Sequence, residues 1–84
     1  IINVEMGNIK PNKIADEFGI CVRRRRHKLD LSQEEFAEKA SIHRTYVSAI
    51  ELGKVDISIT VAHKIARALE TTLSSIIKET EKRI

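Results

Sequence analysis

The chain has 84 residues, of which 42% are hydrophobic and 4% aromatic, and its formal net charge at pH 7 is +3. This length makes one small domain with an aliphatic core, and the positive charge favours a polyanionic partner without requiring one. The lone Cys21 excludes an internal disulfide and fits a reducing cytoplasm, and no apolar run approaches the roughly 20 residues of a membrane span.

The N-terminal part of the chain divides into an arm and a helix. Residues 1–11 have no clear hydrophobic period, and we expect an arm that contacts DNA or a partner subunit, or else a frayed terminus. The domain proper is expected over residues 12–84, with Asn12 able to cap a first helix over residues 13–28. This helix ends in the most basic run of the chain, Arg23-Arg24-Arg25-Arg26-His27-Lys28. Four successive arginines cannot share one helix face, so they cannot all serve one purpose. The aliphatic stem of Arg25 is expected to cover the core while its charged group reaches water.

Two short helical patterns follow, with a very short break between them. Ser32 with Glu35 three residues later forms a capping box, which predicts the start of a helix. Residues 41–43 interrupt the pattern, and Gly53 is placed to end the second helix. Two helices joined this closely predict a helix-turn-helix over about residues 32–52.

The C-terminal third predicts two more helices, which gives an all-α, compact five-helix domain. Ser58 can cap the fourth helix, and Ser74 can cap the fifth, over about residues 74–83. Few residues remain to cover the fifth helix, so its apolar side is the predicted interface of a homodimer. The alternative is that this side, Ile76 above all, only closes the core of the monomer. The predicted interface residues are Ile76, Ile77, Thr80 and Ile84.

The segment SQEEFAEKASIHRTYVSAIELGK resembles the helix-turn-helix of the phage-repressor-like (Cro/C1, XRE-type) transcriptional regulators. The resemblance extends over about residues 18–77, and the HRTYVSAIE run is similar to the controller proteins of restriction-modification systems. It implies a lambda-repressor-like DNA-binding domain in which Arg26 and Glu51 form a partly buried ion pair. A guanidinium suits this pair because it can bond a carboxylate bidentately. Ser41 departs from the family pattern, which commonly has glycine at the turn.

The outward side of the second helix of this motif is small or polar, with one long cation near its start. That composition suits the major groove, where Arg44 can bond a guanine edge and the Thr45 methyl can pack on thymine. Free N–H groups at the start of the first helix attract a phosphate, and the resemblance implies this role for Gln33. His43 is equally well explained as a simple turn residue. The predicted base contacts are Arg44, Thr45, Ser48 and Ala49, and the predicted phosphate contacts are Ser32, Gln33, His43, Tyr46 and Lys54.

Nothing in the sequence predicts an enzyme, a metal site, a cofactor or a small-molecule ligand. The three histidines lack metal-ligand spacing, and Glu51 has no second acid or base beside it. We therefore expect a cytoplasmic, sequence-specific regulator that binds double-stranded DNA as a homodimer on a near-palindromic operator, with a controller protein as one possible identity. Two alternatives remain. One is an antitoxin that binds its own operator and a toxin; the other is a protein-interaction adaptor that has lost the DNA site.

Overall fold

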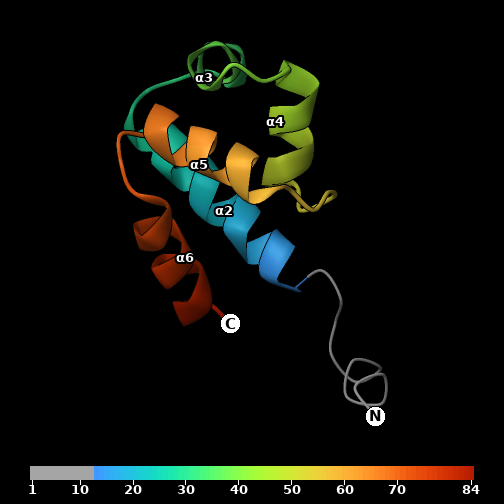
Figure 1. Cartoon of the computed structure of the whole chain (residues 1–84), viewed down its shortest axis with the longest axis vertical. Coiled ribbons are helices and arrows are strands. Elements are labelled where there is room, and N and C mark those ends of the chain that lie inside the picture. Colours follow the sequence, from blue (N-terminus) through green and yellow to red (C-terminus); the bar gives the residue numbers. More distant parts are fainter. Residues whose placement is uncertain (1–12) are drawn as a thin grey trace.

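The computed structural model describes residues 13–84, which form five helices and no strand (Figure 1). They are α2 (Lys13–Lys28), α3 (Gln33–Ala40), α4 (Arg44–Glu51), α5 (Ile59–Ala68) and α6 (Leu73–Lys82). The predicted all-α class with five helices is therefore confirmed. The arm predicted at residues 1–11 and the cap predicted at Asn12 lie outside the described residues. In the described part of the chain, no helix has the length and apolarity needed to cross a bilayer.

Side-chain caps set the starts of α3 and α5 where the sequence predicted them. The Ser32 hydroxyl accepts a hydrogen bond from the Glu35 N–H at 3.0 Å, and the Glu35 carboxylate accepts one from the Ser32 N–H at 2.9 Å. These two bonds are the predicted capping box of α3. The Ser58 hydroxyl accepts from the Val61 N–H at 3.1 Å and caps α5. Each cap satisfies a backbone donor that has no partner within the helix.

The start of α6 differs from the prediction. Its N-cap is Thr72, whose hydroxyl accepts from the Ser75 N–H at 3.1 Å, so the helix begins at Leu73 and Ser74 lies within its first turn. Thr72 has the extended backbone that a cap needs, with φ −103° and ψ 152°, whereas Ser74 and Ser75 lie within the helix. The capping prediction for Ser74 is therefore wrong.

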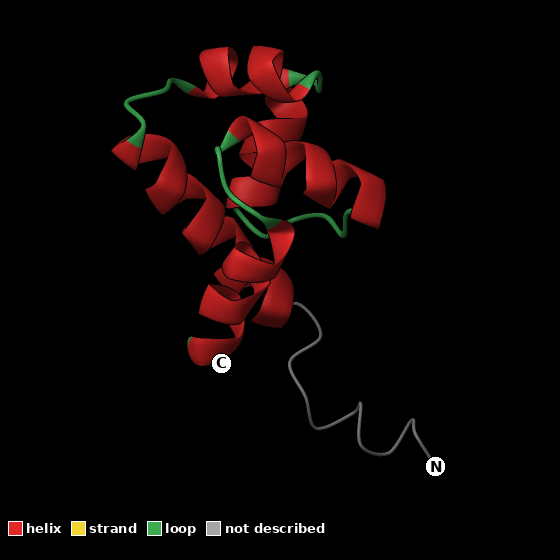
Figure 2. Cartoon of the chain, turned by 60° about the vertical axis from the view of Figure 1, so that its left-hand side comes forward, coloured by secondary structure: helices red, strands yellow, loops and turns green. Residues whose placement is uncertain are grey.

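The core lies where α2 contacts α4 on one side and α6 on the other, while α5 contacts α3 and α6 (Figures 1 and 2). It is aliphatic apart from Phe18 and Phe36, as the composition predicted. Cys21 belongs to it and is fully buried. The largest fully buried apolar side chains are Phe36, Ile65, Ile76, Val22 and Val47.

Gly19 allows the backbones of α2 and α4 to touch. A Cβ atom built at this position would meet the carbonyl oxygen of Ile50 and would lie 2.7 Å from that of Glu51. No side chain fits such an approach, so glycine is needed here for space. The close approach fixes the C-terminal end of α4 against the middle of α2.

Two of the four residues predicted for a dimer interface point into the monomer. Ile76 and Thr80 are both 0% exposed, and the Thr80 hydroxyl donates to the Ile76 carbonyl at 2.8 Å. The prediction is wrong for these two because α6 packs against α2, a contact that buries their side of the helix. Ile77 is half-buried and Ile84 is 61% exposed, so the interface prediction now depends on these two residues.

Candidate nucleic-acid interface

Helices α3 and α4 are joined by residues 41–43, and Ser41 makes the turn possible. Its φ of 57° and ψ of 44° place it in the left-handed region, as helix C-caps often are. The Ser41 N–H donates to the Glu38 carbonyl at 3.2 Å, and the Ile42 N–H donates to the Ala37 carbonyl at 3.0 Å. The turn thereby satisfies two of the last four carbonyls of α3 and redirects the chain into α4.

Helix α4 turns its apolar side inward and leaves the opposite side open. Val47 and Ile50 are buried, whereas Arg44 and Thr45 are exposed at the start of the helix. Ser48 and Ala49, further along the outward side, are partly exposed. All four predicted base-contacting residues are therefore accessible along one helix, with the long cation at its N-terminal end. Leu52, 57% exposed, continues this side past the C-terminus of α4.

An ion pair that is almost completely buried ties α4 to α2. Arg26 Nε lies 2.6 Å from Glu51 Oε2, and Arg26 Nη2 lies 3.0 Å from Glu51 Oε1. The side chains are only 8% and 3% exposed, and Arg26 Nη1 donates to the Leu31 carbonyl at 2.7 Å. The pair is bidentate, and it is the pair that the family resemblance implied. Since both buried charges are partnered, the pair holds α4 in place without leaving an unpaired ion.

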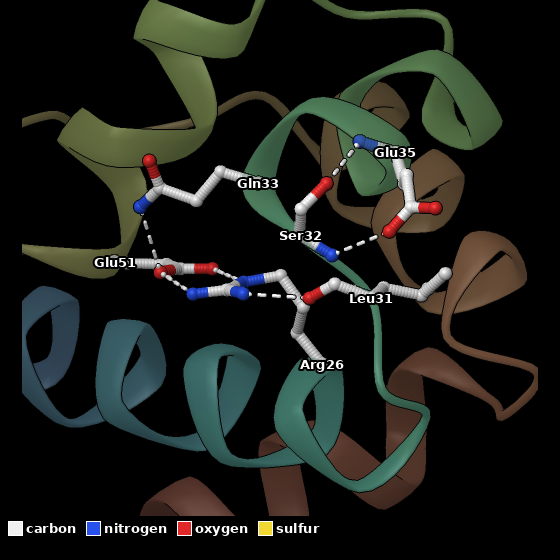
Figure 3. Close-up of polar contacts among 6 residues, drawn as sticks. All are labelled: Arg26, Leu31, Ser32, Gln33, Glu35 and Glu51. Atoms are coloured by element: carbon white, nitrogen blue, oxygen red, sulfur yellow. Dashed lines mark hydrogen bonds and ion pairs between the residues drawn. The ribbon is translucent and has the colours of Figure 1, made fainter.

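Gln33 shares this carboxylate, which the sequence did not predict. Its Nε2 donates to Glu51 Oε1 at 3.1 Å, so Arg26, Glu51 and Gln33 form one connected group across three helices (Figure 3). The bond uses one N–H of the amide and leaves the second N–H for another acceptor. The helix start around Gln33 is thereby positioned by the same contact that positions α4.

The other predicted phosphate contacts differ in how they are held. Ser32 is exposed at the start of α3, with its hydroxyl accepting the capping hydrogen bond. His43 is the N-cap residue of α4 but makes no side-chain cap bond; its Nδ1 lies 3.4 Å from Thr45 Oγ1. Tyr46 is half-buried against the core, and Lys54 is exposed just after α4.

Arg25 does not behave as the sequence suggested. Its charged group was expected to reach water, but Nε lies 2.9 Å from Glu79 Oε1 and Nη1 donates to Thr71 Oγ1 at 3.3 Å. These partners are 54 and 46 residues away in the sequence, so no local pattern could reveal them. Arg25 therefore joins α2 to α6, on the side of α2 away from α4.

An apolar groove of about 310 Å³ lies beside the end of α4. Its rim includes Ile14 and Ile59, which are 50% and 77% exposed. Val55 and Ile57, in the segment that follows α4, form part of its wall, together with Ile77 of α6. The sequence did not predict this groove, because its lining comes from four helices and a loop that only the fold brings together.

Two ionisable groups of this fold, Cys21 and Glu35, serve packing and capping. Burial raises the pKa of the Cys21 thiol, which makes it a core residue and a poor nucleophile. The Ser32 N–H donates to the Glu35 carboxylate and lowers the pKa of that group. Among residues 13–84, no three His, Cys, Asp or Glu side chains gather as a metal site would require.

Comparisons with known proteins agree with this geometry. A family model described as a helix-turn-helix matches residues 22–76. The control protein C.MunI of a Mycoplasma species is 42% identical over 72 residues, which cover 84% of this chain and 97% of that protein. The control protein C.BamHI of Bacillus amyloliquefaciens is 42% identical over 59 residues, which cover 69% of this chain and 73% of C.BamHI.

Solved structures extend the comparison to the fold. The restriction-modification controller protein C.AhdI from Aeromonas hydrophila superposes with a TM-score of 0.72 at 31% identity, covering 74% of this chain and 94% of that one. The clp gene regulator ClgR from Corynebacterium glutamicum shares the fold, with a TM-score of 0.80 at 20% identity. The superposition covers 83% of this chain and 74% of the ClgR chain.

Proposed function

We propose that this chain, which belongs to the helix-turn-helix family of transcriptional regulators, binds one operator sequence in double-stranded DNA as a homodimer. Within that family it is of the restriction-modification controller type. The observation that carries the proposal is the open outward side of α4, which presents Arg44, Thr45, Ser48 and Ala49. The relatives named control proteins favour this function over the antitoxin and adaptor alternatives.

The proposed mechanism places the two α4 helices of a dimer in successive major grooves, about 34 Å apart on a near-palindromic site. The Arg44 guanidinium bonds the O6 and N7 atoms of a guanine, and the Thr45 methyl contacts an adjacent base. Ser48 and Ala49 allow close approach to the base edges. The proposed phosphate contacts, which fix the register of the helix, are Ser32, Gln33, His43, Tyr46 and Lys54.

The proposed dimer uses the apolar groove as its interface. Ile14 and Ile59 expose large apolar side chains that a second copy would cover. Ile77 lines the groove, and Ile84, which is 61% exposed, lies just beyond the end of α6 at Lys82.

Replacing Arg44 with alanine tests the readout. Arg44→Ala should cost about 1–3 kcal/mol of operator binding and relax selectivity at one position, with thermal stability retained because the side chain is exposed. Arg67→Ala removes the same charge from an exposed position on α5 and should leave selectivity unchanged. Competition between an operator selected from random duplexes and a scrambled duplex measures the effect. Unaltered selectivity in Arg44→Ala would refute the assignment.

A charged residue in the groove tests the dimer. Ile59→Glu should give a monomer in sedimentation velocity at a concentration where the natural chain is a dimer, since a carboxylate cannot be buried unpaired. Leu52→Glu changes an equally large apolar residue outside the groove and should stay dimeric. A dimeric Ile59→Glu protein would place the interface elsewhere.

A further inference from the structure

The fold accounts for only two of the four successive arginines of α2. Arg25 joins α6 through Glu79, and Arg26 joins α4 through Glu51. Arg23 and Arg24 are both exposed, and neither takes part in the ion pairs found within residues 13–84. They carry the same charge on the same helix, so only the direction of each side chain separates them.

The direction of Arg23 follows from its helical neighbours. Residues three and four apart lie on the same side of a helix, so Arg23 lies between Gly19 and Arg26. Both of these contact the C-terminal end of α4: Gly19 meets the carbonyl groups of Ile50 and Glu51, and Arg26 bonds the Glu51 carboxylate. Arg23 therefore emerges on the α4 side of α2. Arg24 is rotated from it by about 100° and points away from α4.

This side of α2 continues into the proposed phosphate site. The Glu51 carboxylate that accepts from Arg26 also accepts from Gln33 at the start of α3, so Gln33 stands above the same stretch of α2 (Figure 3). One helical turn before Arg26, Arg23 is the next exposed cation on that side. A long guanidinium there can bond a phosphate through two N–H groups.

We propose that Arg23 binds a DNA backbone phosphate adjacent to the one held at Gln33, so that α2 clamps the strand from beside α3. The inference rests on the DNA binding proposed above. The four arginines then have different roles. Arg25 and Arg26 stabilise the fold, Arg23 binds DNA, and Arg24 is a solvated charge.

The test compares two neighbouring arginines of the full chain. Binding of Arg23→Ala and Arg24→Ala to the selected operator duplex is measured by fluorescence anisotropy between 0.05 and about 0.3 M KCl. Each lost phosphate contact reduces the slope of log Kobs against log salt by about 0.9, or about 1.8 for a dimer. With this slope, the loss of one contact weakens the binding of the variant relative to the natural chain by about eightfold more at 0.1 M salt than at 1 M salt. Arg24→Ala, with identical net charge, should keep the slope of the natural chain, and Arg23→Lys should keep most of it.

The outcomes separate this inference from the function on which it rests. A smaller slope in Arg23→Ala alone supports the clamp, with circular dichroism expected to report unchanged helix content because alanine favours helix. Equal slopes in the two alanine variants would overturn it, since general electrostatics would then explain the run. If the natural chain itself binds no duplex at low salt, the proposed function fails, and the clamp fails with it.

Discussion

Removing one partner of the buried ion pair should remove much of the stability of this domain. Arg26 is only 6% exposed in the natural chain, and Glu51→Ala leaves its guanidinium with only the Leu31 carbonyl as an acceptor. An unpaired buried charge of this kind costs about 3–5 kcal/mol. A chain of 84 residues has a total stability of about 4–13 kcal/mol at the usual 0.05–0.15 kcal/mol per residue. The single substitution is therefore expected to remove between about a quarter and all of the stability of the domain at 25 °C.

The double variant Arg26→Met with Glu51→Leu provides the matched control. It removes both charges and fills the space with apolar side chains, so it should recover most of the lost stability. Urea unfolding followed by circular dichroism at 222 nm, at one protein concentration, gives the free energies to compare. A loss below about 1 kcal/mol in Glu51→Ala, or an equal loss in the double variant, would refute the reasoning that the cost comes from burying an unpaired charge.

Three further substitutions probe helix contact, turn geometry and capping. Gly19→Ala should lower the free energy of unfolding by about 1–3 kcal/mol in urea, because a Cβ meets the carbonyl groups of α4; a more stable variant would contradict the close approach. Ser41→Gly should raise it by about 0.5–1 kcal/mol, because φ is 57° there, and a loss of stability would show that the turn is unstrained. The pKa of Glu35 in the folded protein lies below its ordinary value of 4.5. The contribution of this carboxylate to the stability of the fold is therefore full above pH 4.5 and is lost as the pH falls through the folded pKa. The decrease in melting temperature from pH 7 to pH 3 should therefore be smaller in Glu35→Gln than in the natural chain. An equal decrease in both proteins would count against the capping role of the carboxylate.

Local chemistry made most of the helix boundaries predictable. The capping box at Ser32 and the cap at Ser58 depend on residues only three positions apart, and both lie where the sequence placed them. The exposed side of α4 follows from helical periodicity, because the inward positions Val47 and Ile50 define its opposite. The Arg26–Glu51 pair needed the family resemblance, since 25 residues separate its members.

Tertiary packing explains what the sequence could not predict. Periodicity identifies the apolar side of α6 but does not say whether α2 or a second subunit covers it, and α2 covers Ile76 and Thr80. The bond from Gln33 to Glu51 depends on the crossing of α3 and α4, which fixes the distance between their side chains. The same holds for Arg25, whose carboxylate partner lies on a helix near the C-terminus.

The two ends of α4 are held very differently. Its C-terminal end is fixed through Glu51, while its N-terminal end lacks a side-chain cap from His43. Amide hydrogen exchange should accordingly be faster at Thr45 and Tyr46 than at Ile50, because fraying begins where fewer bonds must break. In the DNA-binding mode proposed above, the end of the helix placed at the bases is thus its adjustable end. The proposed dimer would then accommodate half-sites that differ by a base pair through a small rearrangement of the first turn of α4, without moving the rest of the domain.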